Sequence, residues 1–122
     1  MNNSGICIRE LIEYFKIEAE DVVVFHDDLD IEFGKVKAKF AGSSAGHNGI
    51  ESIDKFIGKD YSRVRIGIGR PKTNADVSDH VLKDFDEDEM LQLEKITNNI
   101  INSMPLLIDK KLDLFASTVN NK

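Results

Sequence analysis

Cysteine is scarce in this chain and long apolar runs are absent, and each absence excludes a class of protein. A single cysteine, Cys7, cannot form an internal disulfide, so we expect it to be a small core residue in a reducing, cytoplasmic compartment. No apolar run approaches the roughly 20 residues that cross a bilayer, which argues against a membrane-spanning protein. Arg9 and Glu10 interrupt the first apolar stretch, and no small-residue cleavage site follows it, so we expect no secretory signal. The sequence contains no internal repeat, linker or low-complexity tract.

The residues that are present are typical of one small folded domain. The 122 residues leave room for one core, and an apolar fraction of 41% is ordinary for a globular protein. The net charge of −6 argues against a nucleic-acid partner. However, acid concentrates in Glu18–Glu32 and Asp84–Glu89, whereas base concentrates in the segments KVKAKF and RVRIGIGRPK. A local basic face, and with it a nucleic-acid partner, therefore remains open.

Hydrophobic periodicity predicts the order helix, strand, strand, helix, strand, helix, helix. The uninterrupted run VVVFH indicates a strand buried on both faces. The alternating segments KVKAKF and RVRIGIG indicate half-buried strands that each have a cationic face. Pro105 is expected to kink or break the third helix. Three strands are few for four helices, so we expect an α/β domain whose sheet is incomplete. The predicted helices cover residues 4–17, about 50–57, 90–108 and 112–119.

Three aspartates, Asp27, Asp28 and Asp30, come just after the first predicted strand, where open α/β sheets usually place ligands. They could hold magnesium, since carboxylates at strand ends do so. One of them could instead orient a histidine base, as in hydrolytic triads. They could also form a charged turn. His26 cannot easily pair with Asp27, because adjacent strand residues point to opposite faces.

The loop GSSAGHNG contains three glycines and opens a predicted helix, whose free amides favour anions or carbonyl oxygens. It lacks the Lys-Ser/Thr pair of a phosphate-binding P-loop and does not match the dinucleotide fingerprint. Asn48 could be a helix N-cap or a substrate contact. Lys37, Lys39 and Arg65 could contact a phosphate backbone or could simply be solvated strand positions.

Five segments in sequence resemble the bacterial peptidyl-tRNA hydrolase family in their order and spacing. The likeness runs over nearly the whole chain. No one segment is decisive, but five together are specific. They are MNNSG at Met1–Gly5, HDDLDIEFGKVKAKF, GSSAGHNGIESI, YSRVRIGIGRP and DVSDHVLKDF.

The resemblance implies an enzyme that cleaves the ester between a peptide and the terminal ribose of tRNA, so that stalled peptidyl-tRNA is recycled. It implies that residues 1–122 form a single-domain α/β fold around a mixed twisted sheet. It also implies a monomer that uses no metal or cofactor and has tRNA as its partner.

The resemblance also suggests roles for individual residues. By position, Asp27 is similar to the carboxylate that orients and supports the catalytic histidine. Asn2 and Asn48 are similar to the amides that hold the peptide backbone and the attacking water. The basic surface that grips the tRNA acceptor stem is matched by Lys37, Lys39 and Arg65.

The catalytic histidine itself is the main departure from the family pattern. In the family it lies in a Thr-Arg-His-Asn stretch that precedes the MN motif, whereas this sequence begins at that motif and resembles roughly the last two-thirds of the fold. General-base assistance typically contributes 10²–10⁴-fold, so we expect the chain as given to be impaired or inactive. The alternatives are a non-catalytic tRNA- or RNA-binding relative and the product of a decaying gene.

Overall fold

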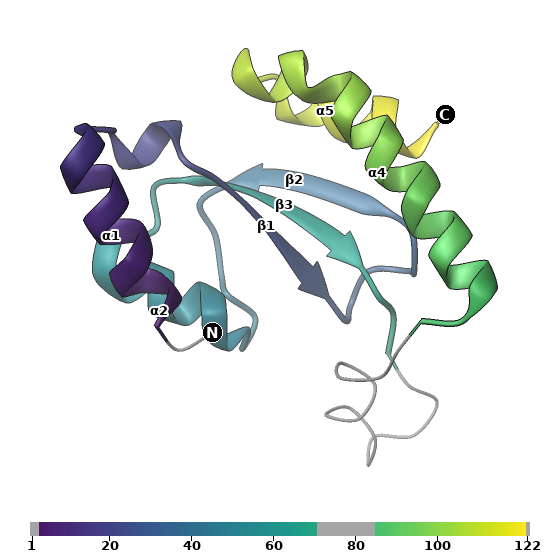
Figure 1. Ribbon diagram of the computed structural model, residues 1–122, viewed down its shortest axis with the longest axis horizontal. Coiled ribbons are helices and arrows are strands. Elements are labelled where there is room, and N and C mark those ends of the chain that lie inside the picture. The colour runs from purple at the N-terminus through teal and green to yellow at the C-terminus, as the bar shows by residue number, and fades with distance from the viewer. Residues whose placement is uncertain (1–2, 71–84, 122) are drawn as a thin grey trace. The chain divides into compact units, whose positions relative to one another are not determined.

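The computed structural model describes residues 3–70 and 85–121, and it divides into two compact units. Unit 1 consists of Met1–His26 and Lys39–Val64, and unit 2 consists of Asp27–Ala38 and Arg65–Lys122. Three strands form a sheet in the order β1-β3-β2 (Figure 1). The strands are β1 (Val23–Asp28), β2 (Val36–Phe40) and β3 (Ser62–Gly67).

Backbone hydrogen bonds show that β1 and β3 are parallel. The pairs advance together along both strands, from Ser62 N donating to Val22 O at 3.0 Å to Ile68 N donating to Asp28 O at 3.1 Å. Evenly advancing pairs of this kind define a parallel ladder.

Strand β2 runs antiparallel to β3. Its flanking pairs join Lys35 to Gly67 at one end and Ala41 to Tyr61 at the other, so the numbering rises along one strand as it falls along the other. The sheet is therefore mixed, as the resemblance implied.

In unit 1, helices α1 and α2 pack closely against each other at Gly5. The amide of Gly5 donates to Oγ of Ser52 at 3.0 Å, and a Cβ atom at Gly5 would collide with the carbonyl oxygen of Ser52. Helix α2 ends at Gly58, whose φ of 82° suits glycine, where the sequence predicted its end. The helical elements are α1 (Ser4–Phe15), the 3₁₀ turn η1 (Ala19–Asp21) and α2 (Asn48–Ile57). The buried core is formed by Ile50, Ile53 and Tyr61, with Ile8, Val22, Val24 and Ile57 packed against it.

In unit 2, helix α4 (Glu87–Ile108) packs against α5 (Leu112–Asn120). Asp86 caps α4 in a reciprocal box with Glu89, in which each side chain accepts the other residue's amide. Pro105 lies in the last turn and does not break the helix, because at that position its ring removes only one hydrogen bond near the end. The buried apolar side chains are Ile31, Val36, Ile100, Leu107, Phe115 and Val119.

Several burial predictions were wrong. Strand β1 is half-buried, with Phe25 40% exposed, because β1 lies at an edge of the described sheet. Cys7 is exposed, since α1 packs on α2 through the face of Gly5 and Ile8. Arg63 is completely buried although its strand alternation predicted an outward position. Over the described part of the chain, no helix is long and apolar enough to cross a membrane.

Candidate functional site

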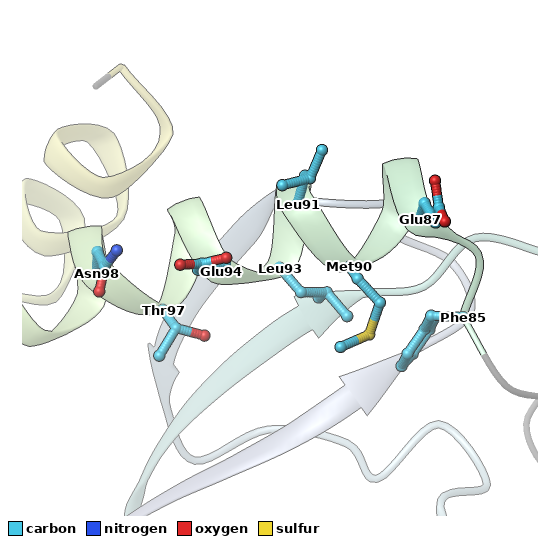
Figure 2. A pocket seen from close by; sticks show the side chains of 8 residues that line it. All are labelled: Phe85, Glu87, Met90, Leu91, Leu93, Glu94, Thr97 and Asn98. Atoms are coloured by element: carbon cyan, nitrogen blue, oxygen red, sulfur yellow. The ribbon is translucent and has the colours of Figure 1, made fainter.

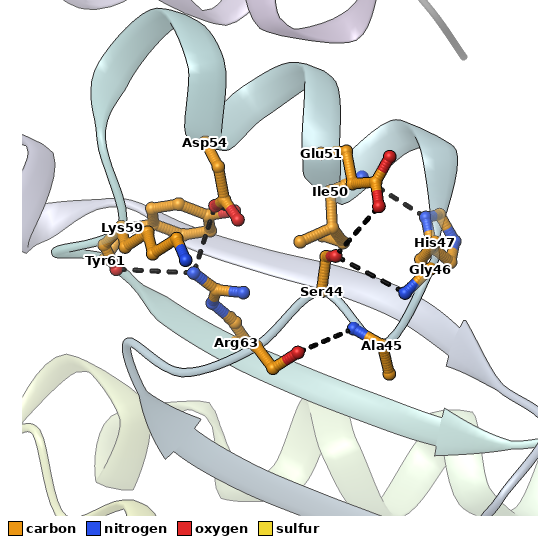
Figure 3. Close-up of polar contacts among 11 residues, drawn as sticks. Ser44, Ala45, Gly46, His47, Ile50, Glu51, Asp54, Lys59, Tyr61 and Arg63 are labelled. Atoms are coloured by element: carbon orange, nitrogen blue, oxygen red, sulfur yellow. Dashed lines mark hydrogen bonds and ion pairs between the residues drawn. The ribbon is translucent and has the colours of Figure 1, made fainter.

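The turn that begins α2 is capped by His47 and not by Asn48. Nδ1 of His47 accepts the amide of Ile50 at 3.2 Å (Figure 3). Asn48 is the first residue of the helix, so the prediction that it could be the N-cap was wrong. Its side chain has no capping role and can both donate and accept hydrogen bonds.

Asn48 lines a shallow groove of about 400 Å³ on the surface of unit 1. Phe56 also lines this groove, and the side chains of Arg9 and Lys55 lie over its ring at 4.9 and 5.7 Å from the centroid. The groove therefore offers an amide, an apolar wall and positive charge. Its lining residues are Ile6, Asn48, Glu51, Ser52, Lys55 and Phe56.

The three aspartates that follow the first predicted strand differ in their environment. Asp27 and Asp28 lie within β1, both half-buried, and adjacent strand positions face opposite sides of the sheet. Asp28 stabilises the turn that follows β1 and links β1 to the neighbouring strand β3. Its carboxylate accepts hydrogen bonds from the amide of Asp30 at 2.8 Å and from Nη1 of Arg65 at 3.3 Å. Asp30 is exposed and pairs with Arg70, which hydrogen-bonds to this carboxyl and lowers its pKa.

These acids do not gather into a metal site within the described residues. In residues 3–70 and 85–121, no group of three histidine, cysteine, aspartate or glutamate side chains could hold an ion. The magnesium hypothesis therefore gains no support from this part of the chain.

Two histidines meet in unit 1. His26 is half-buried in β1, and its ring contacts that of His47 edge to face, with 5.0 Å between the centroids. The sequence did not reveal this contact, because the two histidines are 21 positions apart in the chain.

The predicted tRNA-binding cations are not equally available. Lys37 is exposed on β2, whereas Lys39 is half-buried and lies against Gly42 of the following loop. The side chain of Arg65 is 25% exposed and forms an ion pair with Asp28. Arg65 is therefore not the simple solvated strand position that was one of its two interpretations.

A buried polar cluster of Asp54, Tyr61 and Arg63 was missed by the sequence reasoning (Figure 3). One carboxylate oxygen of Asp54 accepts the Tyr61 hydroxyl at 2.7 Å and Nη2 of Arg63 at 3.0 Å. The Arg63 guanidinium also lies over the Tyr61 ring, 4.5 Å from the centroid. Burial, together with the hydrogen bond to Asp54, raises the pKa of Tyr61. The available signal was the position of Asp54, one turn after Ile50 on the buried side of α2.

A second cavity, of about 660 Å³, lies along α4 in unit 2 (Figure 2). Figure 2 shows Phe85, Met90 and Leu93 pointing to the same side of α4. None of the predicted site residues lines this cavity, whose lining is Phe85, Glu87, Met90, Leu91, Leu93, Glu94, Thr97 and Asn98.

One residue with a predicted role lies outside the described residues: Asn2, which was matched to a peptide-binding amide.

Comparisons with known proteins agree with the resemblance. The family model described as peptidyl-tRNA hydrolase matches residues 1–122. A peptidyl-tRNA hydrolase of Pelagibacter ubique (strain HTCC1062) is 91% identical over 122 residues, which make up all of this chain and 66% of that protein. A peptidyl-tRNA hydrolase of Aliarcobacter butzleri (strain RM4018) is 49% identical over 113 residues, which cover 93% of this chain and 62% of the relative.

A solved structure shares the fold. The crystal structure of peptidyl-tRNA hydrolase from Acinetobacter baumannii superposes with a TM-score of 0.87 at 30% identity, covering 98% of this chain and 61% of that one. The chain thus spans slightly less than two-thirds of the length of these relatives. The match of a family model to all 122 residues shows that the chain belongs to the peptidyl-tRNA hydrolase family.

Proposed function

We propose that this chain provides the substrate-binding part of a peptidyl-tRNA hydrolase, which cleaves the ester between a peptide and the terminal ribose of tRNA. The observation that carries the proposal is the family match over residues 1–122, supported by the relative at 91% identity. The protein acts on tRNA in the cytoplasm as a monomer and without a metal or cofactor.

In the proposed reaction, water attacks the ester carbonyl carbon and gives a proton to a base. The bond from that carbon to the ribose oxygen breaks, and the ribose oxygen takes up a proton. The Asn48 and Asn2 amides hold the peptide backbone and the water, and Asp27 orients the imidazole base. The resemblance places that histidine in a stretch that is not among these 122 residues. The support for Asn48 is its position at the first turn of α2, where its amide lines a groove.

The tRNA acceptor stem is bound by Lys37, Lys39 and Arg65. The exposed ammonium of Lys37 is the best placed of the three to meet a phosphate. Each phosphate contact to duplex nucleic acid contributes about 0.9 to the slope of log K against log salt. Replacing Lys37 by alanine should therefore reduce the magnitude of that slope by about 0.9.

The proposal is tested by the rate of hydrolysis of N-acetyl-aminoacyl-tRNA. The enzyme is a chimera in which these 122 residues replace the matching part of the Pelagibacter ubique protein. We expect Asp27→Asn to lower kcat/KM by roughly 10²-fold or more, because the base loses its orienting carboxylate. Glu20→Gln, an exposed acid in η1, is the matched control and leaves the rate unchanged.

The 122 residues alone are expected to hydrolyse this substrate near background, since the proposed base is supplied by the remaining part of the chimera. An inactive chimera, or one whose rate is unaffected by Asp27→Asn, contradicts the proposal. The 122 residues alone could instead turn over this substrate, with Asp27→Ala abolishing the turnover. That result would refute the role of a base outside these residues.

A further inference from the structure

The turn that presents Asn48 is held by the side chain of the residue before it. The side-chain cap at this helix start is the hydrogen bond from the Ile50 amide to Nδ1 of His47, at 3.2 Å. A ring nitrogen that accepts a hydrogen bond from this amide carries no proton, so the neutral ring bears its proton on Nε2. The imidazole is also fixed from its side, because the ring of His26 in β1 packs edge to face against it.

The loop before His47 reinforces this arrangement. The amide of His47 donates to the carbonyl oxygen of Ser44 at 3.0 Å, and Oγ of Ser44 lies 3.3 Å from Oε1 of Glu51, one turn into the helix. Figure 3 shows Ser44, Gly46 and His47 folded back beside the first turn of α2. The main chain on both sides of Asn48 is thereby tied down.

We propose that His47 is a positioning residue that fixes Asn48 for substrate. The proposal rests on the proposed function, in which the Asn48 amide holds the peptide backbone, and it adds a role for the histidine before it. The first four amides of a helix lack intrahelical partners, and a helix that loses its cap frays from the first residue. Asn48 is that first residue. Small displacements of a positioning group cost up to about 10²-fold in rate, so the cap controls whether the amide is in place.

Histidine is not the only side chain that can perform this role. Asparagine is among the best N-cap residues, whereas alanine is among the worst. His47→Asn therefore keeps the cap and removes the imidazole, and His47→Ala removes both. Gly58→Ala is the matched control: glycine there has a φ of 82°, so alanine strains the other end of α2 without touching the first turn.

The probe is an acetylated dipeptide joined by an amide to 3′-amino-3′-deoxyadenosine, which mimics the ester but is not cleaved. Its dissociation constant is measured by titration with the 122-residue chain and each variant. We expect His47→Ala to weaken binding by roughly five- to tenfold, about the effect of losing one N-cap. His47→Asn restores binding to within about threefold of the original chain, as the capping ranks predict. Gly58→Ala lowers thermal stability and leaves the dissociation constant unchanged. Equal weakening in His47→Asn and His47→Ala would overturn the proposal.

A second measurement decides the proposal without the ligand. Nuclear magnetic resonance of the chain should show His47 protonated on Nε2 and unprotonated on Nδ1. In His47→Ala the Ile50 amide should lose its protection from exchange and the Asn48 side-chain amide should become more mobile, and both should recover in His47→Asn. Unchanged order at Asn48 in His47→Ala overturns the proposal. Failure of the probe to bind the original chain, or unchanged binding by Asn48→Ala, instead counts against the proposed function.

Discussion

Breaking the buried ion pair between Asp54 and Arg63 at one partner should cost a large part of the stability of this protein. The Arg63 side chain has no exposed surface and that of Asp54 is only 10% exposed, with 3.0 Å between Nη2 and Oδ1. Nε and Nη1 of Arg63 are buried and find no hydrogen-bond partner in the described structure. The cation therefore depends on one carboxylate, one carbonyl oxygen and the Tyr61 ring.

Removing one member of a buried pair leaves an uncompensated charge and costs about 3–5 kcal/mol. Asp54→Asn is the most informative single change, because the amide oxygen still accepts the Tyr61 hydroxyl while the negative charge is lost. Arg63→Met removes the cation and keeps an apolar chain of similar length. Domains of this size have a free energy of unfolding of about 5–15 kcal/mol, so either variant should lose about a fifth of it or more.

Urea unfolding followed by circular dichroism at 25 °C measures the effect. With a slope of about 1–3 kcal/mol per molar urea, a loss of about 3 kcal/mol moves the midpoint down by about 1–3 M. The double variant Asp54→Asn with Arg63→Met should be more stable than the sum of the two losses implies, by up to about 3 kcal/mol. The exposed pair of Asp30 and Arg70 provides the control, since Asp30→Asn should leave the midpoint in place.

Two results would refute this reasoning. One is a shift below about 0.3 M in both single variants, which at ordinary slopes corresponds to less than about 1 kcal/mol. The other is strict additivity in the double variant, which would mean that the two charges do not stabilise each other.

Three further predictions concern stability. Burial and the hydrogen bond to Asp54 raise the pKa of Tyr61 in the folded state, so the unfolded chain releases this proton first and the free energy of unfolding should fall as the pH rises above about 10. Tyr61→Phe should flatten this fall. An unchanged alkaline profile in Tyr61→Phe would contradict the raised pKa of Tyr61. Gly5→Ala should lower the melting temperature, because the new Cβ atom would collide with a backbone carbonyl of α2. A melting temperature equal to that of the original chain would show that α1 and α2 can move apart at no cost in stability. Asn120→Ala should lower the free energy of unfolding in urea by about 1–3 kcal/mol, because the Asn120 side chain hydrogen-bonds to both the amide and the carbonyl of Val36. Asn121, exposed at the end of α5, is the control, and Asn121→Ala should be neutral. Equal losses in the two variants would show that these two hydrogen bonds do not stabilise the fold.

Local pattern was sufficient for the elements of the fold. The 3.6-residue period of the apolar side chains located α2 and α5 to within a few residues, and Gly58 marked the end of α2. The alternation in two basic segments located β2 and β3. These features depend on neighbours within one or two turns of chain, which is why sequence alone could reveal them.

Burial and pairing were predicted less well. Alternation placed Arg63 on an exposed cationic face, yet Asp54 on α2 neutralises it inside unit 1. The pair of Arg65 with Asp28 joins positions 37 residues apart, and the pattern could not show it. A hydrogen bond or ion pair is decided by which side chains meet in space, and hydrophobic period carries no information on that.

The sequence by itself determined the family, the order of helices and strands, and the residues matched to a peptidyl-tRNA site. Only the tertiary structure decided that His47 and not Asn48 caps α2, that Asp28 and Arg65 neutralise each other, and that an arginine lies in the core. The physical reason is range: propensity and periodicity act over a few consecutive residues, whereas capping geometry, desolvation and charge pairing depend on atoms that folding brings within about 3 Å of one another.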